Sequence, residues 1–185
     1  VKKIDRMRTK WTEMLHQVYS VRDALSAVQS LETEKIYRKE EQLMISIDTF
    51  SKLLESDLPT YVMDDHSEAY LILDRLYIDL KTLEDDQHAM KGAQELFGMD
   101  VVDLAALARH RNTLGSFKQM WDIAALIEDE ANVRGNFTWG ELTEEHLDEI
   151  NAELKRSMVM LEELPGDVAR TTVYFTLHEK CAKLQ

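Results

Sequence analysis

Residues 1–57 contain nothing that breaks a helix, and this run constrains the fold more than any other feature. The first glycine in the chain is Gly92 and the first proline is Pro59. Apolar residues recur every three or four positions through the first half of the run, at Ile4, Met7, Trp11, Met14, Val18, Val21, Leu25 and Val28. This seven-residue repeat predicts a helix whose apolar side packs along another helix.

A second apolar set continues the run, one residue out of phase with the first. Its members are Ile36, Leu43, Ile47, Phe50 and Leu54. The polar residues 32–35 lie at the change of phase, so the run is either one long helix with a register skip or two helices hinged near residues 30–35. Unbroken, it would be about 80 Å long at 1.5 Å per residue. The pair Leu58-Pro59 ends it, because the residue before a proline is disfavoured in helical geometry.

Four further helices are predicted, over residues 65–91, 103–132, 143–164 and 167–184. Their predicted N-caps are Asp64 or Asp65, Asp103, Thr143 and Asp167. Two predicted ends are marked by Lys91-Gly92 and Pro165-Gly166. Apolar seams with helical spacing and no strand pattern longer than three or four residues predict an all-α fold. We expect long antiparallel helices in an elongated bundle or rod, without a sheet.

Charge and composition exclude several classes of partner. The net charge is −13 and the isoelectric point is near 4.9, which disfavours nucleic acid and anionic lipid. No apolar run approaches the ~20 residues of a membrane-spanning helix. The single cysteine, Cys181, is unable to form an internal disulfide, which suits a reducing compartment. Because the chain begins at Val1 without a targeting pattern, we expect an internal piece of a longer protein.

Motifs of catalysis and cofactor binding are absent from the sequence. No GxxxxGK[ST] loop or HExxH pair occurs. Three clusters are weak candidates: Asp64-Asp65-His66 with Glu68 as a metal corner, His146 with Asp148 and Glu149, and Cys181 with His178 three residues earlier. Helix caps and solvated helix faces explain the first two better, and the third lacks an orienting group. We therefore predict no catalytic, cofactor-binding or metal-binding residues, no cofactor and no enzyme activity.

The order of several motifs resembles the dynein heavy chain family where the tail passes into the linker. The resemblance covers nearly the whole chain. The motifs, in order, are the Trp-containing seam from Ile4 to Leu25, Leu58-Pro59, the helix from Asp65 to Met90, Glu95-Leu96-Phe97-Gly98 with the connector Met99-Asp100-Val101, Met120-Trp121-Asp122, Phe137-Thr138-Trp139 followed by Leu142-Thr143-Glu144-Glu145, Leu164-Pro165, and the helix from Tyr174-Phe175 to Leu184.

Two positions depart from the family pattern, and one motif favours a subtype. Thr138 stands where a proline often precedes the tryptophan, and Arg170-Thr171-Thr172-Val173 occupies a place where a further tryptophan is common. Both departures concern the subtype more than the family. The Glu-Leu-Phe-Gly motif is more similar to axonemal than to cytoplasmic members.

The resemblance implies a mechanical role without ATP chemistry of its own. Residues 1–92 would be the distal tail and linker bundle, and residues 93–185 the start of the linker that swings over the ATPase ring. Partners would be the rest of the heavy chain and light or intermediate chains or docking proteins, and the location would be the cytoskeleton, with the ciliary axoneme favoured over the cytoplasm. Neither nucleic acid nor membrane is implied. Large anchors where helices cross would be Trp11, Phe97, Trp121 and Trp139.

A pair of spectrin-like three-helix repeats in a cytoskeletal scaffold is the alternative. Trp11 and Trp121 lie one such repeat apart, and each belongs to an apolar helical seam. The self-similarity fails after the second tryptophan, where a loop over residues 135–140 and two shorter helices follow.

Overall fold

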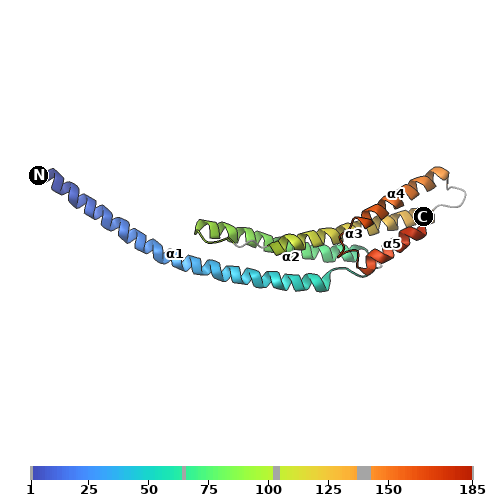
Figure 1. Ribbon diagram of the computed structural model, residues 1–185, viewed down its shortest axis with the longest axis horizontal. Coiled ribbons are helices and arrows are strands. Elements are labelled where there is room, and N and C mark those ends of the chain that lie inside the picture. The colour runs from blue at the N-terminus through green and yellow to red at the C-terminus, as the bar shows by residue number, and fades with distance from the viewer. Residues whose placement is uncertain (1, 64–65, 102–104, 137–142, 185) are drawn as a thin grey trace. The chain divides into compact units, whose positions relative to one another are not determined.

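The computed structural model describes residues 2–63, 66–101, 105–136 and 143–184. Within these ranges the chain forms five helices and no strand, which confirms the predicted all-α helical fold (Figure 1). The helices are α1 (Lys2–Asp57), α2 (His66–Leu96), α3 (Ala105–Asn136), α4 (Glu144–Glu162) and α5 (Thr172–Leu184).

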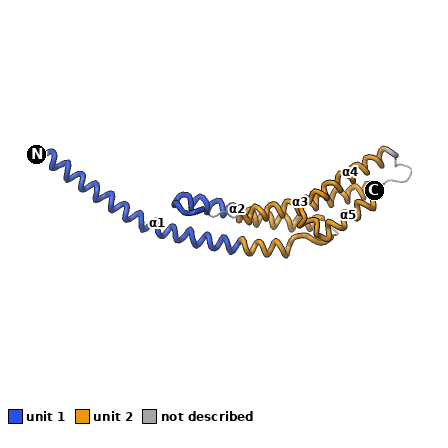
Figure 2. The backbone as a smooth tube through the Cα atoms, viewed as in Figure 1, with its two compact units in different colours: residues 1–46, 85–103 blue, residues 47–84, 104–185 orange. Residues whose placement is uncertain are grey.

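The chain divides into two compact units, each built from separate stretches of sequence (Figure 2). Unit 1 combines residues 1–46 with residues 85–103, and unit 2 combines residues 47–84 with residues 104–185. Each unit therefore holds part of α1 and part of α2. The predicted domains, residues 1–92 and 93–185, are each one continuous stretch of sequence, and that division stays a prediction.

The first run of residues forms one helix, α1, rather than a hinged pair. The change of phase explains this continuity. On a straight helix a heptad stripe drifts by about 20° per repeat, or about 80° over the four repeats before residue 32. One extra residue turns the stripe by about 100° in the opposite sense. The skip therefore returns the apolar stripe to the same side of a straight helix, and no hinge is needed.

The two seams of α1 differ completely in exposure. The second seam is buried, with Ile36 and Leu43 each 6% exposed and Phe50 4%. The first seam, from Ile4 to Val28, is exposed at all eight positions, with values between 51% and 65%. We refer to these eight residues as the N-terminal seam. Trp11 anchors no helix crossing among the described residues, because its side chain is 59% exposed.

Helix α2 ends at Leu96, five residues beyond its predicted end at residue 91. The motif Glu95-Leu96-Phe97-Gly98 forms its C-terminal end. The N–H of Met99 donates to the carbonyl of Gln94 at 2.9 Å, and the N–H of Gly98 donates to the carbonyl of Glu95 at 3.2 Å. Gly98 has a φ of 65°. These bonds make a Schellman cap, in which the N–H groups of a left-handed residue and of the residue after it bond the last carbonyls of a helix. Gly92 was the wrong choice because it lies inside the helix with no positive φ.

Gly98→Ala is expected to destabilise unit 1 by about 1 kcal/mol, since a side chain in left-handed backbone carries a steric cost. Gly92→Ala is the matched control. An added Cβ there meets nothing within 4 Å, and alanine is the better helix former, so this variant should gain about 0.5–1 kcal/mol. Urea unfolding followed by circular dichroism measures both. Equal changes in the free energy of unfolding for the two variants would contradict the role of Gly98 as the left-handed residue of the cap.

The core of unit 2 includes a packed trio of helices, α3, α4 and α5. Each helix contributes residues that are at most 3% exposed, except Leu177 at 7%. From α3 these are Leu107, Leu114, Phe117, Met120, Trp121, Ile123, Ala124 and Ile127; from α4, Leu154 and Leu161; from α5, Val173, Leu177 and Cys181.

Of the predicted caps, Thr143 is confirmed and Asp167 is wrong. The Thr143 side chain accepts the N–H of His146 at the start of α4. Residues 167–170 form turns instead of a helix, because the Pro165 carbonyl accepts the N–H groups of both Val168 and Ala169. Helix α5 begins five residues later than predicted, where the Thr171 hydroxyl accepts the N–H of Tyr174 at 3.3 Å. Asp64, Asp65 and Asp103 lie outside the described residues.

Candidate functional site: the junction at the end of α1

The non-helical segment after α1 is held by two helices from the C-terminal half of unit 2. Pro59 is buried, and its carbonyl accepts the indole N–H of Trp121 in α3 at 3.1 Å. The next carbonyl, that of Thr60, accepts the hydroxyl of Thr172 at the start of α5 at 2.8 Å. We call Pro59, Thr60, Trp121 and Thr172 the junction. The non-helical segment that begins at the proline is thus held in place by hydrogen bonds from residues distant in the sequence.

Burial makes the bond from Trp121 the central contact of the junction. Its side chain is 1% exposed, so the indole N–H needs a protein partner in place of water. The imidazole of His66 packs edge-on against the indole, with ring centroids 5.6 Å apart. His66 begins α2, so Trp121 contacts both the segment that leaves α1 and the helix that follows it.

Asp122, the residue after Trp121, is the centre of a small polar network. The Tyr70 hydroxyl donates to Asp122 Oδ1 at 2.8 Å, and Lys118 Nζ lies 2.9 Å from Asp122 Oδ2. Burial, reinforced by the bond to Asp122, raises the pKa of Tyr70 to about 12. The neutral phenol is therefore the form that joins α2 to α3. The Lys118–Asp122 pair is exposed and adds little to stability.

Ser51 and His110 form the pair that most resembles a catalytic dyad. Ser51 Oγ lies 2.8 Å from His110 Nε2 and 2.9 Å from the carbonyl of Ile47. A hydroxyl has one proton, and donation to Ile47 leaves Oγ to accept from Nε2–H. The imidazole packs edge-on against Phe50, with centroids 5.7 Å apart. Among the described residues no carboxylate orients the ring, so the pair acts as a helix–helix contact.

His110 makes stability depend on pH. Burial, with a smaller contribution from Arg109, lowers the pKa of His110 below the ordinary 6.5. The unfolded chain therefore binds the proton more tightly than the folded chain. The stability contribution is complete above pH 6.5 and declines as the pH falls through 6.5 toward the lower folded value.

We expect His110→Gln to lose less stability than the wild type between pH 7.5 and pH 5, since glutamine keeps a polar group there and does not titrate. Thermal unfolding across this range measures the difference. His16→Gln, at an exposed position of α1, is the matched control and should follow the wild type. If stability falls with pH in the same way for all three proteins, His110 is not the source of the pH dependence.

Where the structure describes them, the remaining sequence candidates are not brought together into a site. Cys181 is 0% exposed, and burial raises the pKa of its thiol, the opposite of an activated nucleophile. His178 lies near Tyr174, with centroids 6.3 Å apart. His66 packs on Trp121, and its possible metal partners Asp64 and Asp65 lie outside the described residues.

His146, Asp148 and Glu149 lie in the first turns of α4, whose N-cap is Thr143. His146 Nδ1 lies 3.0 Å from the hydroxyl of Thr143, while Asp148 and Glu149 are exposed. Within the described ranges no group of three His, Cys, Asp or Glu side chains is placed to hold a metal ion.

Sequence reasoning identified Trp121 but missed its partners. The signal was present in two halves: a tryptophan on an apolar seam needs an acceptor for its N–H, and a proline-broken helix end leaves carbonyls free. The two residues are 62 positions apart, and periodicity does not pair residues at that distance.

Comparison of the chain with protein-family models, with characterised proteins and with solved structures found no match. None of the helices in the described ranges combines the length and the apolar character needed to cross a lipid bilayer.

Proposed function

We propose that the chain is a non-catalytic mechanical segment of a dynein heavy chain, joining the tail to the linker that swings over the ATPase ring. It would work within a microtubule motor of the cytoskeleton, in the ciliary axoneme for an axonemal member. Its partners would be the other parts of the heavy chain, and light or intermediate chains or docking proteins. The ATP chemistry would belong to other parts of that protein.

The observation that carries the proposal is the junction. A segment that transmits force between helices needs fixed connections where the chain leaves one helix for the next. After α1, the carbonyls of Pro59 and Thr60 are both bonded by side chains of later helices, at 3.1 Å and 2.8 Å. Pulling on the end of α1 therefore loads α3 and α5 directly, in addition to the segment that leads to α2.

Two motifs of the family resemblance also have structural roles. Glu95-Leu96-Phe97-Gly98 is the Schellman cap that ends α2, and Met120-Trp121-Asp122 supplies the indole of the junction and the acceptor of Tyr70. Motifs that lie at chain reversals and joints are the ones a helical lever has to preserve.

The alternative, a pair of spectrin-like repeats, treats Trp11 and Trp121 as equivalent positions. Their environments differ, since Trp11 is 59% exposed and Trp121 is 1% exposed. The alternative therefore receives no added support from the fold.

The test is to read the source polypeptide onward from Gln185. We expect several strand–GxxxxGK[ST]–helix units in series, because each ATPase module of a motor ring needs its own phosphate loop. Further Trp-bearing helical repeats without a phosphate loop would overturn the motor proposal in favour of the scaffold.

A further inference from the structure

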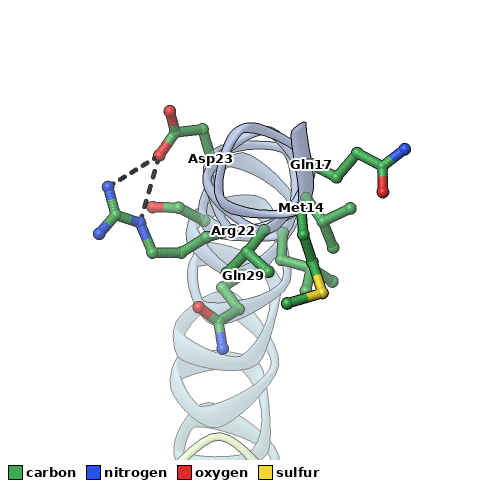
Figure 3. Close-up of a pocket in the computed structure, with 9 residues that line it drawn as sticks. Met14, Gln17, Arg22, Asp23 and Gln29 are labelled. Carbon is green, nitrogen blue, oxygen red and sulfur yellow. Dashed lines mark hydrogen bonds and ion pairs between the residues drawn. The ribbon is translucent and has the colours of Figure 1, made fainter. Parts of the chain in front are cut away.

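The N-terminal seam is an apolar stripe that no described residue covers. Its eight side chains, Trp11 and Met14 among them, are all more than half exposed. Figure 3 shows side chains along this stretch of α1, where Met14 projects from the helix and Arg22 points away from it and pairs with Asp23 at 3.2 Å. An exposed stripe of this length on a soluble helix marks an interaction surface.

The same side of α1 is already covered by a helix within unit 1. Residues 32–46 of α1 face the end of α2, where Ile36 and Leu43 are 6% exposed and Met90 is 7% exposed. Gln94 of α2 donates to Glu40 of α1 at 3.1 Å. Since the register skip keeps both seams on one side of a straight helix, the N-terminal seam continues an existing helix–helix interface.

Charge along the edges of the seam indicates which kind of helix fits. Residues 1–31 carry six Lys or Arg and three Asp or Glu, a net charge of +3 in a chain of net charge −13. In the heptad that places Ile4 and Met7 on the seam, the flanking positions hold Lys3, Arg8, Lys10 and Arg22 and no acidic residue. The acidic residues Asp5, Glu13 and Asp23 occupy the outer positions.

These flanks disfavour a second copy of the same segment. In a parallel pair Lys3 would face Arg8 of the other copy. An antiparallel pair that aligns the two seams sets Arg8 against Arg22, and neither arrangement offers an acidic flank to the lysines. A flat lipid surface fits less well than a helix, because the stripe drifts by about 60° over its three repeats. A partner helix follows such a drift by supercoiling.

We propose that the N-terminal seam binds an amphipathic α-helix of about 25 residues whose apolar stripe is flanked by Asp or Glu. The length follows from the seam, which spans about 36 Å from Ile4 to Val28 at 1.5 Å per residue. Trp11 is the large anchor of this interface, and Lys3, Arg8 and Lys10 pair with the acidic flanks.

The probes are two labelled 28-residue helical peptides with leucine at both seam positions of each heptad. One has Glu at all flanking positions and the other has Lys. Binding to the full chain is measured by fluorescence anisotropy. We expect the Glu peptide to bind at least tenfold more tightly than the Lys peptide, and the difference to shrink as salt is raised, because exposed charges are screened.

Two pairs of variants locate the interface. Val18→Asp places a charge on the seam, and Ser20→Asp places the same charge on the outer side. Binding of the Glu peptide should weaken at least tenfold for the first and less than threefold for the second. Lys10→Glu should weaken it more than Arg6→Glu. All four positions are exposed, so thermal unfolding should be unchanged and serves as the folding control.

Three outcomes would overturn the proposal. If the Glu and Lys peptides bind equally, or if neither binds, a helix with acidic flanks is not the partner of the seam. Sedimentation equilibrium showing a dimer of the chain that Val18→Asp dissociates makes a second copy the occupant. Tight binding to vesicles of three parts phosphatidylcholine and one part phosphatidylserine, with no peptide binding, makes the seam a lipid-binding face.

Discussion

Trp121→Ala is expected to lower the free energy of unfolding by about 3–5 kcal/mol, the range for removing a buried aromatic side chain. The variant loses the packing against His66 and leaves the carbonyl of Pro59 without its donor. Both losses fall on unit 2, so the urea transition of its helices should move to lower concentration. Circular dichroism at 222 nm follows the transition.

Trp121→Phe separates the hydrogen bond from the packing. Phenylalanine keeps most of the ring but has no N–H, so the buried Pro59 carbonyl is left unpaired at a cost of about 1–3 kcal/mol. We expect this variant to lie between the wild type and Trp121→Ala. A Trp121→Phe protein as stable as the wild type would show that the bond to Pro59 is dispensable, and the junction would then rest on packing alone.

Trp11→Ala is the matched control for Trp121→Ala. The same substitution on the exposed N-terminal seam should change the free energy of unfolding by less than about 0.5 kcal/mol, since little area leaves a protein environment. A large loss of stability at Trp11 would mean that the seam is covered in solution by another part of the chain.

These two tryptophans also show what the sequence was able to predict. Each lies on an apolar seam with helical spacing, and that pattern correctly predicted the helices around them. The pattern reports that a side chain needs a partner, but it carries no information on where the partner comes from. Trp121 contacts the start of α2 and the segment that follows α1, whereas the Trp11 side chain stays 59% exposed.

Helix ends were predictable where one local interaction decides them. Pro59 ends α1 through its own ring, and Thr143 caps α4 through its own hydroxyl. The start of α5 was missed because Asp167 is an equally good cap in isolation. The buried side chain of Val168, 1% exposed, and the shared carbonyl of Pro165 hold those residues in turns. Tertiary packing decided between two local choices.

The Ser51–His110 and Tyr70–Asp122 pairs illustrate the same limit for candidate sites. Their members are 59 and 52 positions apart, on different helices, and no spacing rule connects them. Short motifs for phosphate and zinc sites can be searched for directly, because each is a local pattern of residues, and the sequence has none of them.

Leu154→Ala in α4 is the second substitution with a large expected effect, a loss of about 2–5 kcal/mol. Leu154 is 0% exposed, and α4 packs against both α3 and α5, so the cavity is walled by three helices and has little room to collapse. Val159→Ala, on the same helix at 54% exposure, is the matched control. Its effect should stay within about 0.5 kcal/mol, since alanine also favours the helix.

The two variants test whether the seam of α4 carries the packing that the proposed mechanical role requires. Exposure falls along this seam from 40% at Leu147 to 6% at Ile150 and 0% at Leu161, so the helix is anchored by its middle and end. A cavity at Leu154 should therefore loosen α4 and α5 together, seen as faster hydrogen exchange in both helices. If exchange rises only in α4, the three helices are not one cooperative block, and a load applied to α5 would not be shared by α4.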